Sequence, residues 1–193
     1  MRKILQMSSI VVLFFLLLLS ACGQNAGESQ LPTEQRAEEN DAGQPGFPLA
    51  LSDASGVEHR LEERPQRLVS VAPSITENVF ALQAGDRLVG VSDWDNYPAE
   101  VAQIERIGGL EPNLEKILSL EPDLVLAQLS VNDNSIQALR DAGLNVLVLP
   151  SVKTFEDAYE VLRMLGQALG AQEQAEAVIR EMEAKKAEIT AKV

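Results

Sequence analysis

The sequence predicts an α/β fold built around a mostly parallel sheet, and three observations support this prediction. From residue 67 onward, short apolar runs alternate with stretches that have helical periodicity. Two of the runs, Asp123–Ala127 and Asn145–Leu149, are apolar almost throughout, which is typical of strands that a parallel sheet buries on both faces. Only 4% of the 193 residues are aromatic, so we expect a mostly aliphatic core. Strands and helices that alternate at this length favour parallel strands joined by right-handed crossovers.

A β-hairpin is predicted before this alternation begins. The strand-like runs Phe47–Leu51 and Val57–Leu61 flank Ser52–Gly56, a turn-forming segment that ends in glycine. The only histidine of the chain, His59, lies in the second run. We expect His59 at the surface of the hairpin rather than as a ligand.

The first strand–helix–strand unit extends from residue 67 to residue 91. Arg67–Val71 is its first strand, and a helix is predicted to open at Ser74. We expect Ser74 to be the N-cap and Glu77 to complete a capping box three residues later. Gly85 stands where a glycine that ends the helix is expected, and Leu88–Val91 is the next strand.

Further helices are predicted from the spacing of apolar residues and from the residues at the helix ends. They are Asn113–Leu120, which Asn113 caps; Ser135–Ala142; Thr154–Leu169, which Gly170 ends; and Gln172–Val193. The last helix has an apolar stripe formed by Ala175, Val178, Met182, Ile189 and Val193. No glycine or proline ends it, so we expect the chain to be incomplete.

The composition argues against several classes of function. The 16 basic and 29 acidic residues give a formal net charge of −13, which argues against nucleic acid as a partner, because phosphate binding needs a clustered basic surface. A single cysteine excludes an internal disulfide framework, and a single histidine excludes a zinc site with several histidines. An enzyme on an α/β scaffold stays an alternative, although the sequence contains no GxGxxG motif and no P-loop motif.

The N-terminal segment has the features of a secretory signal. Arg2 and Lys3 precede Ile10–Leu19, an uninterrupted apolar run that is short for a membrane span. Small residues then lead directly to Cys22, and this arrangement resembles a bacterial lipobox. The resemblance implies cleavage before Cys22 and diacylation of its thiol; an ordinary signal peptide and a short membrane anchor are the alternatives. We therefore expect a lipid-anchored protein on the extracytoplasmic face of the cell membrane.

The chain divides into four segments. Residues 1–21 form the signal peptide, and residues 22–46 form a flexible tether. Gly23–Gly46 has one aliphatic side chain larger than alanine, so it cannot bury enough apolar area to offset the entropy of ordering. Residues 47–170 are expected to form the α/β lobe, and residues 171–193 the start of a long helix.

Candidate functional residues lie where the predicted strands end. Ligands bind beyond the carboxyl ends of parallel strands, which singles out Ala72–Ser74, Ser92–Pro98 and Gln128–Asn132. Trp94, the only tryptophan, would offer a flat apolar face to a large ring if it is exposed; the alternative is an indole packed under its own loop. Tyr97 is expected to shape this loop or to donate its hydroxyl hydrogen to a ligand amide.

Five stretches of the α/β part match one pattern in their order and spacing. They are Arg67–Glu77, Leu88–Pro98, Ile107–Gly109, Asn113–Ile117 and Glu121–Ala127. Together they resemble the N-terminal lobe of ABC-importer substrate-binding proteins for cobalamin, ferric siderophores and haem, the class III or helical-backbone periplasmic binding proteins. The resemblance covers residues 47–193. It implies a Rossmann-like lobe, a long α-helix that joins two lobes, and a second lobe that is missing from this chain.

The resemblance also implies roles for individual residues. Trp94 aligns with an aromatic residue that lines the ligand cleft between the lobes. The other cleft-facing positions are Pro73, Gly109, Leu110 and Gln128. Glu77 is either a capping carboxylate favoured by the helix dipole or, as in the family, a carboxylate that meets an arginine pocket on the membrane permease. The implied partners are that permease and its ATPase, and we expect the protein to be a monomer.

The sequence predicts ligand binding without catalysis and without a metal or cofactor held by the protein. Carboxylates are plentiful, but they are not clustered with nitrogen or sulfur donors. A metal that arrives inside a corrinoid or a ferric siderophore needs only shape and polar contacts. Asp93 and Asp95 would repel anionic catecholate chelates and tolerate neutral or cationic ones. Haem, with Tyr97 as the candidate iron ligand, is one alternative; a truncated, non-functional fragment is another.

Overall fold

The computed structural model describes residues 46–129 and 133–192. The strands are β1 (Leu49–Ser52), β2 (Glu58–Leu61), β3 (Leu68–Ser70), β4 (Leu88–Val91), β5 (Glu105–Arg106), β6 (Leu124–Gln128) and β7 (Val146–Leu149). The α-helices are α2 (Pro73–Ala81), α3 (Leu114–Ser119), α4 (Asp133–Asp141), α5 (Phe155–Leu169) and α6 (Gln172–Thr190), and short 3₁₀ helices occupy Gly85–Arg87 (η1) and Ala99–Gln103 (η2). The signal peptide, Cys22 and nearly all of the expected tether lie outside the described residues.

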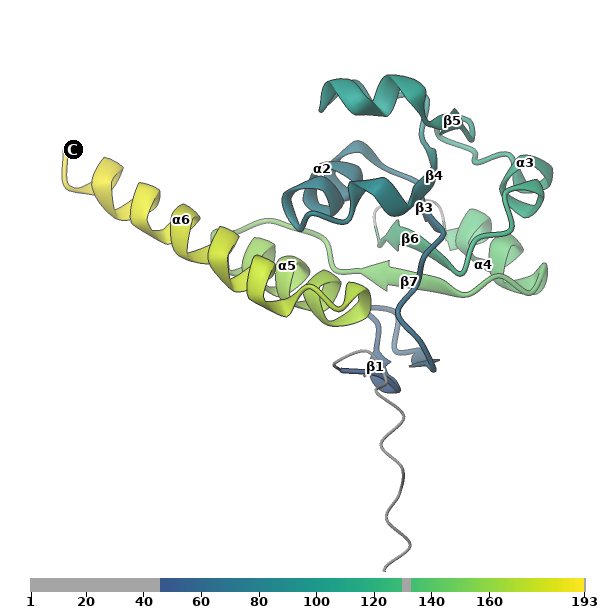
Figure 1. The fold of residues 1–193 in the computed structure, drawn as a ribbon, viewed down its shortest axis with the longest axis horizontal. Helices are drawn as coiled ribbons and strands as arrows, with labels where there is room; N and C mark the ends of the chain where they lie inside the picture. Colours follow the sequence, from purple (N-terminus) through teal and green to yellow (C-terminus); the bar gives the residue numbers. More distant parts are fainter. Residues whose placement is uncertain (1–45, 130–132, 193) are drawn as a thin grey trace, which may run out of the picture. The chain divides into compact units, whose positions relative to one another are not determined.

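The main sheet is fully parallel. Its strand order is β5-β4-β3-β6-β7, so β5 and β7 form its two edges (Figure 1). The hairpin β1–β2 is a separate antiparallel pair, in which Leu51 lies opposite His59. The predicted α/β class with a parallel sheet is therefore confirmed, and each predicted strand exists within a residue or two of its expected place.

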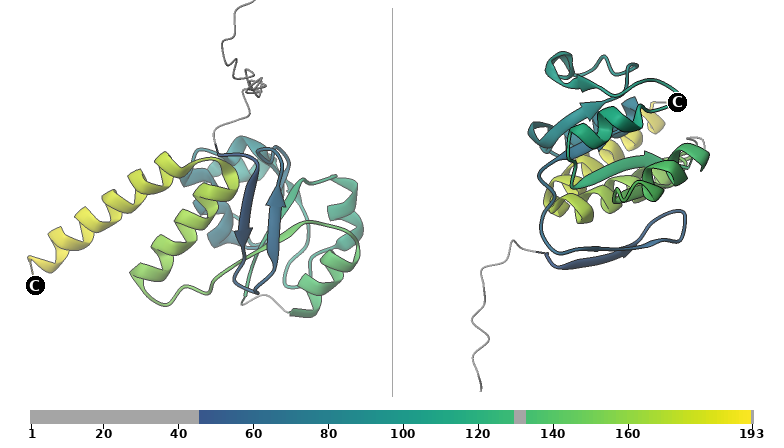
Figure 2. Two further views of the ribbon diagram at one scale, coloured as in Figure 1. Left: turned by 90° about the horizontal axis from the view of Figure 1, so that it is seen from below. Right: turned by 90° about the vertical axis from the view of Figure 1, so that its right-hand side faces the viewer.

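Helices cover the main sheet on both faces (Figure 2). Leu124 and Leu126 belong to the core beneath α2, α5 and α6, whereas Val125 and Ala127 belong to the core beneath α3 and α4. Successive side chains of a strand point to opposite faces. A strand covered on both faces must therefore be apolar at every position, which explains the continuous apolar runs in the sequence.

Helix α5 begins and ends as its sequence predicts. The Thr154 side chain accepts the backbone N–H of Asp157, and Asp157 accepts the N–H of Thr154 at 2.8 Å, which forms a capping box. Gly170 closes the helix in the left-handed conformation, with φ of 60°. Helix α6 then packs on α5 so closely that a Cβ on Gly166 would lie 2.8 Å from the Cβ of Ala175.

The apolar stripe of α6 is buried only in the first half of the helix. Ala175 and Ile179 are buried, whereas Ile189 is 53% exposed. No helix in the part of the chain that the structure describes is long and apolar enough to cross a membrane.

Two predicted helix ends are wrong. Ser74 is not the N-cap of α2, because Ala72 takes that position and Pro73 begins the helix. Proline suits a first helical position, since its φ is already helical and its missing N–H would have no partner there. Gly85 does not end α2 but begins η1; a Cβ there would lie 2.3 Å from the Phe80 ring, so packing rather than capping requires the glycine.

Candidate functional site

Exposed apolar side chains concentrate at the carboxyl edge of the parallel sheet. Large apolar residues that are exposed in the segments following β4, β5, β6 and β7 are Trp94, Tyr97, Leu110, Leu129, Val152 and Phe155. Because all five strands run in the same direction, these segments lie at one edge of the sheet. This is the edge at which the sequence places a ligand site.

Trp94 occupies a tight turn directly after β4. The Ser92 hydroxyl donates to a carboxylate oxygen of Asp95 at 2.6 Å, and the backbone N–H of Asp95 donates to the carbonyl of Ser92 at 3.2 Å. The backbone N–H of Asp93 donates to the carbonyl of Gly108 at 2.9 Å. The indole of Trp94 remains 65% exposed, so it is not packed under its own loop.

The backbone at Gly109 supports the indole. A Cβ built on Gly109 would lie 3.2 Å from Nε1 and 3.3 Å from Cζ2 of Trp94. The ring therefore rests against the segment that follows β5, and a Cβ at position 109 would require the ring to shift by a few tenths of an ångström. Two of the predicted site residues, Trp94 and Gly109, are thus brought together from different loops.

An arginine that the sequence analysis did not single out secures the same loop. Nη1 of Arg106, on β5, donates to the carbonyls of Ser92 at 2.8 Å and Asp95 at 2.9 Å, and Nη2 donates to the carbonyl of Val101 at 3.3 Å. All three acceptors are main-chain atoms, which any residue type supplies. The sequence therefore carries no signal that would have identified this contact.

The expectation that Asp93 and Asp95 both present negative charge to a ligand is wrong for Asp95. Asp95 is only 3% exposed and its carboxylate turns inward to the Ser92 hydroxyl, whereas Asp93 is exposed. The other oxygen of Asp95, Oδ1, is buried without a hydrogen-bond partner in the described residues. Only Asp93 contributes a solvent-facing carboxylate in this loop.

The remaining predicted site residues lie at the same edge with different degrees of exposure. Leu110 is 77% exposed and Tyr97 is 65% exposed. Pro73 is half-buried at the start of α2, next to the central strand β3. Gln128 is half-buried at the end of β6 and donates its amide N–H to the carbonyl of Pro150 at 3.2 Å. Gln128 therefore connects the ends of β6 and β7 to each other. Ligand contact stays a prediction for all of these residues.

Glu77 lies exposed on α2, four residues after Pro73, the first residue of the helix. It is therefore too far along the helix to form the capping box that its spacing from Ser74 suggests. Within residues 46–129 and 133–192 no ion pair involves its carboxylate. An exposed carboxylate that forms no ion pair among the described residues suits a docking contact, which stays a prediction.

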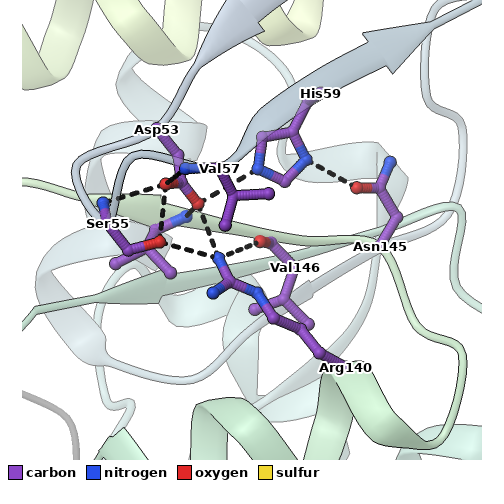
Figure 3. A network of polar contacts seen from close by, with 8 residues as sticks. Asp53, Ser55, Val57, His59, Arg140, Asn145 and Val146 are labelled. Atoms are coloured by element: carbon purple, nitrogen blue, oxygen red, sulfur yellow. Dashed lines mark hydrogen bonds and ion pairs between the residues drawn. The ribbon is translucent and has the colours of Figure 1, made fainter.

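A second polar centre surrounds Asp53, and it overturns the expected surface position of His59 (Figure 3). His59 is only 7% exposed, with Nε2 at 3.0 Å from Asp53 Oδ2 and Nδ1 at 2.8 Å from Asn145 Oδ1. The two-residue period of a strand places His59 on the same face as the buried Leu61. That spacing is the signal in the sequence that could have predicted its burial.

The carboxylate of Asp53 accepts six hydrogen bonds. Oδ1 accepts from the N–H and hydroxyl of Ser55 and from the N–H of Val57, whereas Oδ2 accepts from His59, from Nη2 of Arg140 at 2.7 Å and from the N–H of Val148 at 3.1 Å. Burial by itself raises the pKa of this carboxyl, but the hydrogen bonds to the ionised form outweigh burial and lower the pKa to about 2.

The Asp53 centre attaches the hairpin to the free edge of β7. The N–H of Ala54 donates to the carbonyl of Val148 at 2.8 Å, and Arg140 donates to the carbonyl of Val146 at 3.2 Å. With the bond from Val148 N–H to Asp53, these contacts satisfy outward-facing groups of an edge strand, which otherwise invite pairing with other chains. His59 therefore has a structural role, and the described residues contain no group of three or more His, Cys, Asp or Glu side chains placed to hold a metal.

Known proteins share this architecture and parts of this sequence. An uncharacterized ABC transporter substrate-binding lipoprotein of Bacillus subtilis, YvrC, is 36% identical over 168 residues, which cover 86% of this chain and 51% of the relative. A periplasmic solute-binding protein of Staphylococcus epidermidis, described as possibly iron-binding, superposes with a TM-score of 0.64 at 27% identity over 68% of this chain and 52% of the other. The periplasmic vitamin B12 binding protein BtuF of Vibrio cholerae superposes with a TM-score of 0.60 at 27% identity, over 66% and 51% of the two chains.

The chain thus spans about half the length of these relatives. The model of the family described as "Periplasmic binding protein" matches residues 68–193, from the first strand of the parallel sheet through the last helix. The resemblance drawn from the sequence is confirmed by this match, and the chain belongs to the periplasmic binding protein family.

Proposed function

We propose that this protein is the extracytoplasmic substrate-binding component of an ABC importer, and that it captures a metal chelate such as a corrinoid or a ferric siderophore. The observation that carries the proposal is the Trp94 indole, 65% exposed at the carboxyl edge of a parallel sheet and backed by Gly109. Named relatives that include a vitamin B12 binding protein and a possible iron-binding protein support this ligand class.

The chemistry of the carboxyl edge suits binding rather than catalysis. Trp94, Tyr97 and Leu110 offer apolar surface and one hydroxyl, but no nucleophile with a base beside it. The only histidine is committed to the buried Asp53 centre. Since a large ring ligand gains most of its affinity from apolar surface, an exposed indole is the most valuable contact that this edge supplies.

Electrostatics favour a neutral or cationic chelate. The chain carries a formal net charge of −13, and Asp93 keeps one carboxylate facing solvent next to Trp94. An anionic catecholate chelate would meet repulsion from both, whereas a corrinoid or a ferric hydroxamate would not. Haem is the second candidate, because Tyr97 is 65% exposed at this edge and a tyrosine is able to coordinate haem iron.

Titration of the full-length protein with cyanocobalamin, a ferric trihydroxamate and haemin tests the proposal. We expect saturable quenching of Trp94 fluorescence by one probe at micromolar concentration, without chemical turnover of that probe. Calorimetry should show that Trp94→Ala weakens binding by about tenfold or more, as removal of a central aromatic anchor does. Ile189→Ala, which truncates an exposed apolar residue on α6, is the control and should bind as the wild type does. Failure of all three probes to bind at micromolar levels would refute the transport function.

The same proposal includes anchoring through Cys22 and docking of Glu77 to the permease. Cys22→Ala should release the mature protein from the membrane fraction, because no acyl chains are attached. Retention of that variant in the membrane fraction would argue for another kind of anchor.

Glu77→Ala should reduce ligand uptake by cells while leaving ligand affinity in vitro unchanged, because it removes only the carboxylate offered to the permease. Glu160→Ala, which removes an exposed carboxylate on α5, is the matched control and should leave uptake unchanged. Equal uptake by both variants would exclude Glu77 as a docking residue.

A further inference from the structure

Trp94 belongs to neither apolar core cluster of the described residues, so contacts outside the core must hold its indole in one orientation. Trp94 is 65% exposed, and the contact that positions its ring is the backbone at Gly109. The turn that carries it is bonded to itself through Ser92 and Asp95. A side chain this exposed normally samples several rotamers on the nanosecond timescale.

Arg106 contacts both ends of this turn. Its Nη1 donates to the carbonyl that precedes Trp94 by two residues, on Ser92, and to the carbonyl that follows it by one, on Asp95, at 2.8 and 2.9 Å. Its Nη2 donates to the carbonyl of Val101 in η2, which fixes the far side of the loop. Arg106 belongs to β5, which pairs with β4 through Val91, so its backbone is anchored in the sheet.

The guanidinium of Arg106 donates to these main-chain carbonyls. No ion pair in the described part of the chain involves Arg106, although the chain is strongly acidic. Hydrogen bonds from a charged donor are roughly twice as strong as those between neutral groups. The planar fork of arginine also fixes the direction of each bond, which the single ammonium of a lysine does not.

We propose that Arg106 is the positioning residue of the ligand platform: it holds Ser92 and Asp95 at a fixed separation and so keeps the Trp94 indole against Gly109, ready to receive the ligand. This inference rests on the proposed function of Trp94 as the ligand contact. A ligand that meets a pre-ordered indole does not have to supply the free energy of ordering it, and affinity is higher for that reason. Arg106 does not need to touch the ligand to have this effect.

The first test needs no ligand. Because Trp94 is the only tryptophan among these 193 residues, the fluorescence anisotropy decay of this chain reports the motion of that one side chain. In the 193-residue chain, Arg106→Met should add a fast component to the decay, because the turn loses its hydrogen bonds from the guanidinium. Arg163→Met is the matched control: it removes an arginine whose Nε donates to Glu176 at 2.8 Å between α5 and α6, and it should leave the decay unchanged.

The second test measures affinity for cyanocobalamin, a ferric trihydroxamate and haemin. For the probe that the wild type binds, Arg106→Met should weaken binding about tenfold, and Arg106→Lys should lie between it and the wild type. The lysine variant also serves if the methionine variant does not fold, since it keeps the charge. The proposal would be overturned if the Arg106 variant that folds showed the same anisotropy decay and the same affinity as Arg163→Met. If the wild type binds no probe, the proposed function fails, but the anisotropy comparison still decides whether Arg106 orders Trp94.

Discussion

Two loops of this protein each bury an aspartate, one near the β7 edge of the main sheet and the other near its β5 edge. The two carboxylates differ in how many hydrogen bonds they accept. Asp53 follows β1 and accepts six hydrogen bonds, from donors on the hairpin, α4 and β7. Asp95 follows β4 and accepts one, from Ser92, while its other oxygen has no partner among the described residues. The Asp53 carboxylate connects three segments, whereas the Asp95 carboxylate only shapes the turn that carries Trp94.

The difference suggests that the Asp53 loop serves the stability of the fold, whereas the Asp95 loop serves the proposed ligand binding. All the hydrogen bonds that the Asp53 carboxylate accepts come from donors within the described residues. Around Asp95 the loop leaves a large apolar side chain in solvent, which is unfavourable for the isolated domain and useful only when something covers it. Changes at the two aspartates should therefore have very different effects on folding.

The largest effect is expected for Asp53→Ala. The substitution removes the carboxylate that accepts from His59, Arg140 and the N–H of Val148. We expect the free energy of unfolding to fall by roughly 3–5 kcal/mol, as when one partner of a buried ion pair is removed. Chemical denaturation measures this loss, and Asp93→Ala, at an exposed position beside Trp94, is the control that should change stability little. Equal losses of unfolding free energy in Asp53→Ala and Asp93→Ala would contradict the special role of Asp53 in stability.

Stability should also depend on pH through Asp53. Its carboxyl has a pKa of about 2 in the folded protein, against an ordinary value of 3.8. The lower folded pKa means that the ionised form is stabilised by folding, by about 2 kcal/mol. This contribution is complete above about pH 4 and is lost as the pH falls towards 2.

Unfolding measured at a series of pH values checks this expectation. The difference in stability between the wild type and Asp53→Asn should shrink as the pH falls from 4 to 2. A difference that stays constant across this range would mean that Asp53 has no lowered pKa.

A smaller effect is expected for Asp95→Asn. Only the hydrogen bond from the Ser92 hydroxyl depends on this carboxylate, and the amide oxygen of asparagine is able to accept it. We expect a loss of about 1 kcal/mol or less in the free energy of unfolding. Parallel denaturation of Asp53→Asn and Asp95→Asn compares the two loops directly, and a larger loss at Asp95 would contradict the assignment of stability to the Asp53 centre.

The smallest effect on folding is expected for Trp94→Ala. Because the indole is 65% exposed, its removal should change the free energy of unfolding by less than about 0.5 kcal/mol. Thermal and chemical unfolding of this variant should therefore resemble those of the wild type, while its ligand affinity falls by about tenfold or more. A large loss of stability would show that the ring is part of the core rather than a ligand surface.

Much of the fold was predictable because its signals are local. Strands buried on both faces require continuous apolar runs, and Thr154 and Gly170 mark the ends of α5 through contacts within a few residues. The errors occur where a residue's partner is distant. His59 was expected at the surface, yet it is buried against Asn145, 86 positions away. Gly85 was expected to end a helix, but the Phe80 ring packed against it explains the glycine.

The candidate site was partly predictable for the same reason. The ends of parallel strands meet at one edge, so a lone tryptophan after β4 was predictable as an exposed residue of the candidate site, and ligand contact stays a prediction. The inward turn of Asp95 and the contacts of Arg106 were not predictable, because they involve main-chain carbonyls and a geometry that residue types do not encode.

The order of apolar runs and helical stretches alone determined the class of fold, the parallel direction of the strands and the edge of the sheet at which Trp94 lies. The reason is that few arrangements of strands and helices bury all of these apolar runs and stripes. Only the tertiary structure decided which polar groups are buried and which face solvent. Their burial is favourable only when donors and acceptors from distant segments meet at hydrogen-bond distance, as Asp53 and Arg140 do across 87 positions.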